Sequence, residues 1–226
     1  MNINLRGFVI VAFLFVSCSV VGEKLPGYII SRTNDTMEVQ INVPMKESYN
    51  ALTNAPYYEP IINYFNAKVT YYGANGKKSI LYPSQAKEFG FTYKNTEYTF
   101  LSRKDDLKNH PFDNDSCVFL RLQQDGYLKM FDCIIKKQDG GYNPATNTTN
   151  GSIYMYEDQY ILQKGDGELF QAKPSSFAHQ MSAYLSDYKD LSNKIAYRKY
   201  KMSDMHTIVI LYNSWKAIEN RKVNNK

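Results

Sequence analysis

The feature that most constrains the fold is a succession of short, alternating apolar runs that extends from residue 27 to residue 172. Such alternation turns apolar side chains toward one face of a strand, and turn residues at short intervals are typical of antiparallel hairpins. The Asn75-Gly76 pair between two of these runs is a strong local hairpin signal. We therefore expect about five successive hairpins in a curled, barrel-like or sandwich-like antiparallel sheet, a shape that protects sheet edges.

Two stretches of this region do not fit the hairpin pattern. Residues 44–66 contain three prolines and show no clean period, so we expect irregular structure there. Residues 139–152 are rich in Gly, Asn and Thr and are expected to form a mobile hairpin tip. The predicted strand pairs are 27–32 with 36–43, 68–72 with 78–82, 88–93 with 97–101, 118–122 with 127–135, and 153–162 with 168–172.

After Pro174 the apolar period changes from 2 to 3.6, which indicates helices. The apolar stripes are Phe177, Met181, Tyr184 and Leu185; Leu191 and Ile195; and Met205, Ile208, Val209, Tyr212 and Trp215. Stripes of this width pack on a sheet. The predicted fold class is therefore α+β, mainly antiparallel β, with a C-terminal cap of two to three helices over residues 174–218 and a basic tail over 219–226.

The first 22 residues have the pattern of a secretory signal peptide. Arg6 is followed by an apolar run over residues 7–16 and then by small residues, and this order of basic, apolar and small is the signature of such a signal. The run is shorter than the ~20 apolar residues of a membrane span. We therefore expect an extracytoplasmic protein in which residues 23–226 form a single domain.

Two processing routes for this segment remain open. Signal peptidase cleavage after Gly22 would release the domain, whereas residues 14–18 form a loose lipobox in which Cys18 would become a lipidated N-terminus. The first route predicts a secreted or periplasmic protein. The second predicts an outer-membrane-anchored one, and a lipid at Cys18 is the only membrane contact that we expect.

Export makes the two remaining cysteines, Cys117 and Cys133, informative, because oxidising compartments favour disulfides. A two-residue turn at 125–126 would place Val118 opposite Cys133. A three-residue loop at 124–126 would collect the apolar side chains on one face and place Cys117 opposite Cys133. We expect the second register and a Cys117–Cys133 disulfide worth about 3 kcal/mol. The alternative, a catalytic thiol, would need a nearby histidine.

The sequence nominates no catalytic, cofactor-binding or metal-ligating residue, and we expect no cofactor. The three histidines, His110, His179 and His206, lie in no metal-ligand spacing, and neither a phosphate-binding glycine loop nor a G-x-S-x-G elbow is present. Removing residues 1–22 leaves 26 Lys and Arg against 22 Asp and Glu, mostly interspersed. Interspersed charge argues against nucleic-acid binding, which requires a basic face.

Several short motifs, in their order along the chain, suggest a resemblance. They are Pro26-Gly27-Tyr28-Ile29-Ile30, Asn34-Asp35-Thr36, Tyr82-Pro83-Ser84, Phe89-Gly90-Phe91, Tyr184-Leu185-Ser186-Asp187, Ile195, Lys199-Tyr200, Asp204 and Tyr212-Asn213. Together with the signal peptide they resemble an uncharacterised group of exported proteins of Bacteroidetes-type bacteria. The resemblance implies a lineage and an envelope address but no activity. It also implies one departure, because Tyr188 stands where relatives tend to carry a cysteine.

These observations favour a non-catalytic exported module, binding or structural, that presents a tyrosine-rich sheet to a glycan, a peptide or another envelope protein. One alternative is an envelope hydrolase acting on glycan or peptide, and another is a subunit of a cell-envelope assembly. A binding module predicts exposed tyrosines in a concavity, and an enzyme predicts a histidine that meets an Asp, Ser or Cys in a pocket. An assembly subunit predicts an exposed apolar patch or an open sheet edge.

Overall fold

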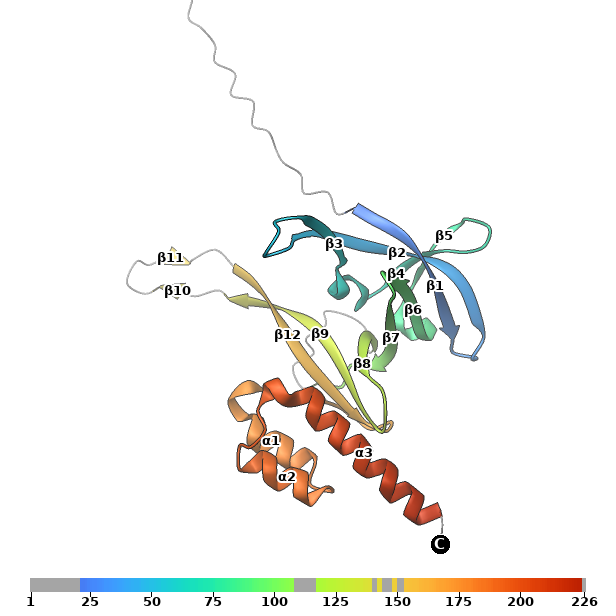
Figure 1. The fold of residues 1–226 in the computed structure, drawn as a ribbon. Helices are drawn as coiled ribbons and strands as arrows, with labels where there is room; N and C mark the ends of the chain where they lie inside the picture. The colour runs from blue at the N-terminus through green and yellow to red at the C-terminus, as the bar shows by residue number, and fades with distance from the viewer. Residues whose placement is uncertain (1–20, 108–116, 140–141, 144–147, 150–152, 225–226) are drawn as a thin grey trace, which may run out of the picture.

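The structure is a computed structural model that describes residues 21–107, 117–139, 142–143, 148–149 and 153–224, with the side chains of residues 21, 133–159 and 224 outside that description. It confirms the predicted fold class: most of the chain is antiparallel sheet, and helices follow at the C-terminus (Figure 1). The strands are β1 (Val21–Ser31), β2 (Thr36–Tyr49), β3 (Pro56–Pro60), β4 (Val69–Tyr72), β5 (Lys78–Leu81), β6 (Ala86–Tyr93), β7 (Thr96–Lys104), β8 (Cys117–Gln124), β9 (Leu128–Asp139), β10 (Tyr142–Asn143), β11 (Thr148–Thr149), β12 (Ile153–Lys164) and β13 (Leu169–Gln171). The helices are α1 (Phe177–Tyr184), α2 (Lys189–Ala196) and α3 (Met205–Asn224), and the short 3₁₀ turns are η1 (Ile62–Phe65), η2 (Pro83–Gln85), η3 (Pro174–Ser176) and η4 (Met202–Asp204).

Eleven strands form one open, curled sheet in the order β13-β12-β9-β8-β7-β6-β1-β2-β4-β5, with β3 paired to β2 beside this path. The sheet is not a simple meander, because β1 lies between β2 and β6. Strands β10 and β11 form a separate small ladder that continues the long β9–β12 hairpin (Figure 1). The strand order therefore brings the first and the middle thirds of the chain into one curved layer.

The N-terminal half of the sheet curls around an aromatic core. Phe65, at the end of η1, lies with its ring centre 5.1 to 5.6 Å from those of Phe89, Phe91 and Phe100. Phe89 and Phe100 stack at 4.6 Å, and Phe119 meets Phe89 edge-on at 4.8 Å. All five rings are essentially inaccessible to solvent. Ring packing of this kind contributes beyond the area that it buries, and it holds η1 inside the curl.

A close approach of strands explains two of the glycines in the quoted motifs. A β-carbon on Gly27 would lie 2.3 Å from the carbonyl oxygen of Gly90, and one on Gly90 would lie 2.7 Å from the Tyr28 ring. Tyr28 therefore covers Gly90 across the β1–β6 pair, and its hydroxyl donates to Glu88 at 2.6 Å. Burial and the Glu88 carboxylate together raise the pKa of Tyr28 to about 12.

The helical cap packs on the other end of the sheet. The apolar stripes predicted for the helices are confirmed: every member is buried or half-buried against Leu128, Met130 and Leu162 of β9 and β12. Two boundaries differ from the prediction. Strand β1 already includes Val21, which pairs with Met45, and α3 runs to Asn224 and so includes most of the expected basic tail.

The register of the β8–β9 hairpin is not the predicted one. Arg121 lies opposite Asp132, a shift of three residues from the register that would place Cys117 opposite Cys133. The cause lies in α3: the side chain of Asn213 accepts a bond from the amide of Leu128 at 2.7 Å and donates to its carbonyl at 3.0 Å. With both of these groups bonded to Asn213, Leu128 does not pair with β8.

The corrected register removes the support for the predicted disulfide. Three strand residues span about 10 Å, and a disulfide requires α-carbons within about 7 Å. Cys117 pairs with Lys104 of β7 and carries a free thiol. The side chain of Cys133 lies outside the described residues, so the Cys117–Cys133 disulfide stays a prediction. The register on which that prediction depended is not the observed one.

One hairpin was missed altogether. Two parts of residues 44–66 are regular, since β2 continues through Pro44 to Tyr49 and turns back as β3 over Pro56–Pro60. The predicted tip over residues 139–152 falls mostly outside the described residues; its described parts are β10 and β11. The other expected strand pairs are all formed, and β6 and β7 are joined by a tight turn at Lys94 and Asn95.

Candidate functional site

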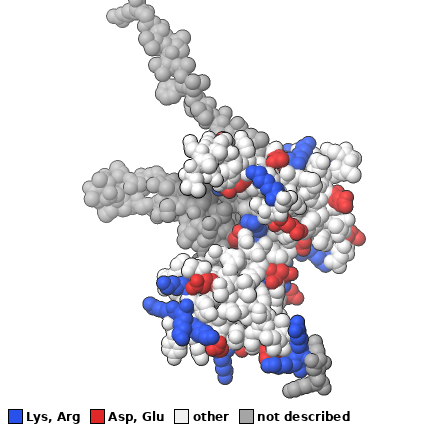
Figure 2. Space-filling view, in the orientation of Figure 1, with Lys and Arg blue, Asp and Glu red and all other residues white. Residues whose placement is uncertain are grey.

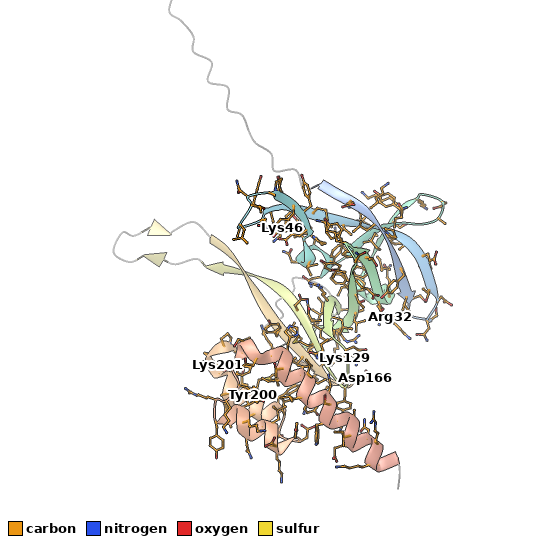
Figure 3. The ribbon with its side chains drawn as sticks, in the orientation of Figure 1. Arg32, Lys46, Lys129, Asp166, Tyr200 and Lys201 are labelled. Carbon is orange, nitrogen blue, oxygen red and sulfur yellow. The ribbon has the colours of Figure 1, made fainter. Side chains whose placement is uncertain are left out.

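An open groove lies between the missed β2–β3 hairpin, with η1, and the strands β7, β8 and β9. Its volume is about 500 Å³. The groove is lined by Lys46, Glu59, Pro60, Ile61, Ile62, Asn63, Tyr64, Tyr98, Arg121 and Asp132. Lys46, labelled in Figure 3, marks the hairpin side of the groove. The site is thus built from four separate segments that only the curl of the sheet brings together.

The hairpin wall carries an ion pair that bridges its two strands. Lys46 of β2 lies directly opposite Glu59 of β3, and its Nζ is 2.8 Å from Glu59 Oε1. The hydroxyl of Ser48 donates to the same oxygen at 2.9 Å. The bonds from Lys46 and Ser48 outweigh the effect of burial and hold the pKa of Glu59 below its usual range. Glu59 is therefore an ionised hydrogen-bond acceptor at neutral pH.

The turn η1 lines the groove next to the hairpin, and its position is fixed by Phe65 and Asn66. Because Phe65 points into the aromatic core, the preceding residue, Tyr64, points outward with 54% of its surface exposed. Asn66 then ties η1 to β8: its side-chain amide donates to the Phe119 carbonyl at 2.8 Å, and its carbonyl accepts from the Phe119 amide at 3.0 Å. The exposed ring of Tyr64 is thus carried on a segment that is anchored at both ends.

The sheet wall carries a second ion pair, packed on aromatic rings. Arg121 Nη1 lies 3.3 Å from Asp132 Oδ2, and the side-chain amide of Gln123 donates to that oxygen at 2.5 Å. The Arg121 guanidinium lies 4.4 Å from the ring centre of Tyr98, which in turn stacks on buried Phe91 at 5.0 Å. A cation over an aromatic face is attracted by the ring quadrupole, so Arg121 is held in one orientation from two sides.

The groove is electrically balanced, whereas the molecule is not. Two cations, Lys46 and Arg121, face two anions, Glu59 and Asp132. By contrast, residues 173–226 carry ten Lys and Arg against four Asp and Glu, and the helical cap accordingly displays much of the blue surface in Figure 2. A neutral groove neither attracts nor repels a ligand by long-range charge. Hydrogen bonds and ring contacts are the interactions that such a groove offers to a ligand.

The polar groups of the groove are preorganised acceptors and donors. Each carboxylate is bonded to a cation and to a neutral donor, Glu59 to Lys46 and Ser48 and Asp132 to Arg121 and Gln123, so both are held in one orientation. Among the described residues, no three His, Cys, Asp or Glu side chains gather so as to hold a metal ion. The arrangement therefore suits recognition of hydroxyl or amide groups beside an apolar face.

The structure brings none of the described histidines into this groove. His179 is exposed on α1, and His206 is exposed on α3 with its ring 6.1 Å from Tyr160. His110 lies outside the described residues. Cys117, the other candidate nucleophile, is half-buried near the start of β8 and does not line the groove. The constellation expected for a histidine-dependent enzyme is thus not assembled at this site.

A second concavity of about 580 Å³ lies between β13 and α1. It is lined by Asp106, Leu107, Glu168, Leu169, Phe170, Gln171, Lys173, His179, Gln180, Ala183 and Tyr184. The chain leaves this concavity at Leu107 for residues 108–116, which the structure does not describe. The β2–β3 groove is the better candidate because its polar side chains are held in place by two ion pairs and by ring contacts.

Residues of the C-terminal motifs meet in one partly exposed polar cluster between the cap and the sheet. The hydroxyl of Tyr212 donates to Asp187 Oδ2 at 2.5 Å, and Lys164 of β12 pairs with Asp187 Oδ1 at 2.7 Å. Burial opposes the charge of Asp187, but the bonds from Lys164 and Tyr212 outweigh it and hold its pKa below the usual range. Burial and Asp187 both raise the pKa of Tyr212. These residues fasten the cap to the sheet.

No known protein family, curated protein or solved structure matches this chain. In the part of the chain that the structure describes, no helix combines the length and apolar character needed to cross a membrane. Function is therefore inferred from the groove and from the sequence.

Sequence reasoning did not find the groove. Lys46, Glu59 and Tyr64 lie in the stretch that lacks a period, and Arg121 and Asp132 meet only in the corrected register. One signal was present: Lys46 and Glu59 stand at positions that pair if Asn50 and Ala55 close a turn, as they do. The three prolines argued against strands on either side of that turn.

Proposed function

We propose that this chain is an exported, non-catalytic envelope protein that binds a neutral glycan in the β2–β3 groove. The observation that carries the proposal is the pairing of every charged group of the groove with an opposite charge, beside the exposed ring of Tyr64. A sugar hydroxyl both donates and accepts, so it can bridge a paired cation and anion without displacing either. The apolar face of a sugar ring packs on tyrosine. A charged ligand would have to break one of the pairs.

Binding of oligosaccharides by the purified mature protein tests this proposal. An array of neutral glucans, xylans, mannans and chitin fragments identifies a ligand, and isothermal titration measures its affinity. Tyr64→Ala is expected to weaken binding about tenfold, while Tyr197→Ala, at a tyrosine that is 80% exposed on the cap, leaves it unchanged. The proposal fails if no neutral oligosaccharide binds, or if Tyr64→Ala binds as tightly as the native chain.

The envelope hydrolase is a second candidate, because two carboxylates, Glu59 and Asp132, line one groove. Glycosidases use such a pair, but one member must act as a general acid with a raised pKa. The lowered pKa of Glu59 favours binding over catalysis. Release of reducing ends from a bound glycan distinguishes the two functions. Turnover that Glu59→Gln or Asp132→Asn abolishes, with binding retained, would establish an enzyme.

The third candidate, a subunit of an envelope assembly, would need a sheet edge that can pair with another strand. The edge strand β3 gives little support for this, because its outward-facing residues offer few free hydrogen-bonding groups. The Asn50 amide donates to the Ala55 carbonyl, and the Ile61 amide donates to the Pro44 carbonyl. These two bonds show which residues of β3 direct their backbone groups toward β2. The residues whose backbone faces outward are therefore Pro56, Tyr58 and Pro60. Proline has no N–H to offer an incoming strand, and the Tyr58 carbonyl already accepts the hydroxyl of Tyr93 at 2.8 Å.

A further inference from the structure

The end of the β2–β3 hairpin, residues 48–58, differs from the groove that the same hairpin borders. These eleven consecutive residues contain no charged side chain. Four large apolar side chains in this segment are exposed: Tyr49 (58%), Leu52 (96%), Tyr57 (40%) and Tyr58 (48%). In Figure 2 this end of the molecule, at the upper left of the described part in Figure 1, is correspondingly free of red and blue. An exposed cluster of this kind marks a contact surface.

The backbone amides of residues 52–55 at the tip have partners within the tip itself. Asn50 Oδ1 accepts from the amides of Leu52 at 2.9 Å and Thr53 at 3.1 Å, and the Asn54 amide donates to the Asn50 carbonyl at 2.8 Å. Ala55 donates to the Thr53 hydroxyl at 3.4 Å, and the next residue is a proline. An amide that already has a partner does not lose a hydrogen bond on leaving water. These four amides can therefore enter a less polar medium without losing a hydrogen bond.

The position of the tip relative to the N-terminal segment indicates what that medium is. Val21, the first described residue, lies opposite Met45, and β2 continues for four residues beyond this point before the turn. Four strand residues span about 13 Å. The tip thus projects past the start of β1, the end of the strand to which Cys18, three residues earlier in the chain, is covalently joined.

We propose that this tip docks on the interface of a lipid bilayer, with Leu52 entering the acyl boundary and the tyrosines at headgroup level. Leucine and tyrosine are the residues that favour these two depths. Cys18 stands only three residues before Val21, a distance of about 10 Å when extended. A lipid on Cys18 would therefore hold the tip at the membrane surface. Because the tip carries no charge, docking needs no anionic lipid and is insensitive to salt.

Fluorescence of a tryptophan placed at the tip tests the docking directly. The full mature protein carrying Leu52→Trp is mixed with vesicles of phosphatidylcholine brominated in the acyl chains, with and without phosphatidylglycerol. We expect a blue shift and quenching of the new tryptophan, equal in both vesicles. The native Trp215, in the cap, and an Ile80→Trp variant, on the distant edge strand β5, provide unquenched controls.

A partition measurement on the unlipidated chain gives a second readout. Leu52→Asp is expected to lower vesicle binding at least about tenfold, whereas Ile218→Asp, at an exposed apolar residue of α3, does not. Glycan binding in the groove should be unchanged in Leu52→Asp, so the two proposals fail independently. Absence of quenching, a requirement for phosphatidylglycerol, or a lipid-independent dimer that Leu52→Asp dissociates would each overturn the membrane assignment.

Discussion

The curled half of the sheet and the helical cap are held together by different means. The curl encloses five phenylalanine rings, of which Phe65 contacts three others. The cap buries mainly aliphatic side chains, and its placement on the sheet also depends on directional bonds made by Asn213 and Asp187. Ring packing depends on volume and shape, whereas a bond depends on one atom pair. The two regions should therefore fail under different substitutions.

The largest effect is expected in the aromatic core. Phe100→Ala removes a ring that stacks on Phe89 at 4.6 Å and touches Phe65 at 5.1 Å. Loss of a buried phenylalanine leaves a cavity and costs about 3–5 kcal/mol of unfolding free energy. Urea denaturation measures the loss, and Tyr197→Ala, at an exposed aromatic residue, should stay within about 0.5 kcal/mol of the native chain. A change as small as that control would contradict a volume-dependent core.

A smaller effect, confined to the cap, is expected from Asn213→Ala. The substitution leaves the amide and the carbonyl of Leu128 without their partners, at a cost of about 2–3 kcal/mol. Hydrogen exchange should quicken in α3 and in β9 near Leu128, while β6 and β7 keep their protection. Asn220→Ala, at an exposed site of the same helix, is the matched control. Equal loss of protection in both regions would show that cap and sheet unfold as one unit.

The same residue shows what a sequence can and cannot predict. The alternating strands and the helix stripes follow from local periodicity, and they were found. The β8–β9 register depends on Asn213, which is 85 residues away from Leu128, and no local pattern reports that bond. The apolar pattern alone favoured the register that pairs the cysteines.

The groove was unpredictable for a related reason. Proline within a run argues against a strand, and Pro44, Pro56 and Pro60 all lie within or at the ends of strands. They are tolerated in β3 because its prolines face the unpaired edge. Edge position is a property of the sheet order, and that order was not available from the sequence.

A still smaller loss of unfolding free energy is expected from Tyr212→Phe, and the size of this loss depends on pH. The hydroxyl of Tyr212 helps to lower the pKa of Asp187, so the bond stabilises the fold above the unfolded pKa of about 4 and is lost as pH falls through the folded value. At pH 7 we expect a loss of about 1–2 kcal/mol, because Lys164 still pairs with the carboxylate. The difference from the native chain should shrink toward pH 3. Thermal unfolding across this range measures it, with Tyr197→Phe as the control, and a difference independent of pH would exclude the Asp187 linkage.

The smallest effect is expected at Cys117, where the two expectations for this chain are opposed. A Cys117–Cys133 disulfide would contribute about 3 kcal/mol in the unreduced protein, and Cys117→Ser would remove it. In the observed register Cys117 is a free, half-buried thiol, so the substitution should cost less than about 1 kcal/mol, with or without reductant. Alkylation of the unreduced mature protein, followed by peptide mass spectrometry, should label Cys117. If Cys117 stayed unlabelled and Cys117→Ser cost about 3 kcal/mol that reductant abolished, the disulfide would be present. Strands β8 and β9 would then pair three residues away from the register described, and Asn213 would not hold Leu128 by its two hydrogen bonds.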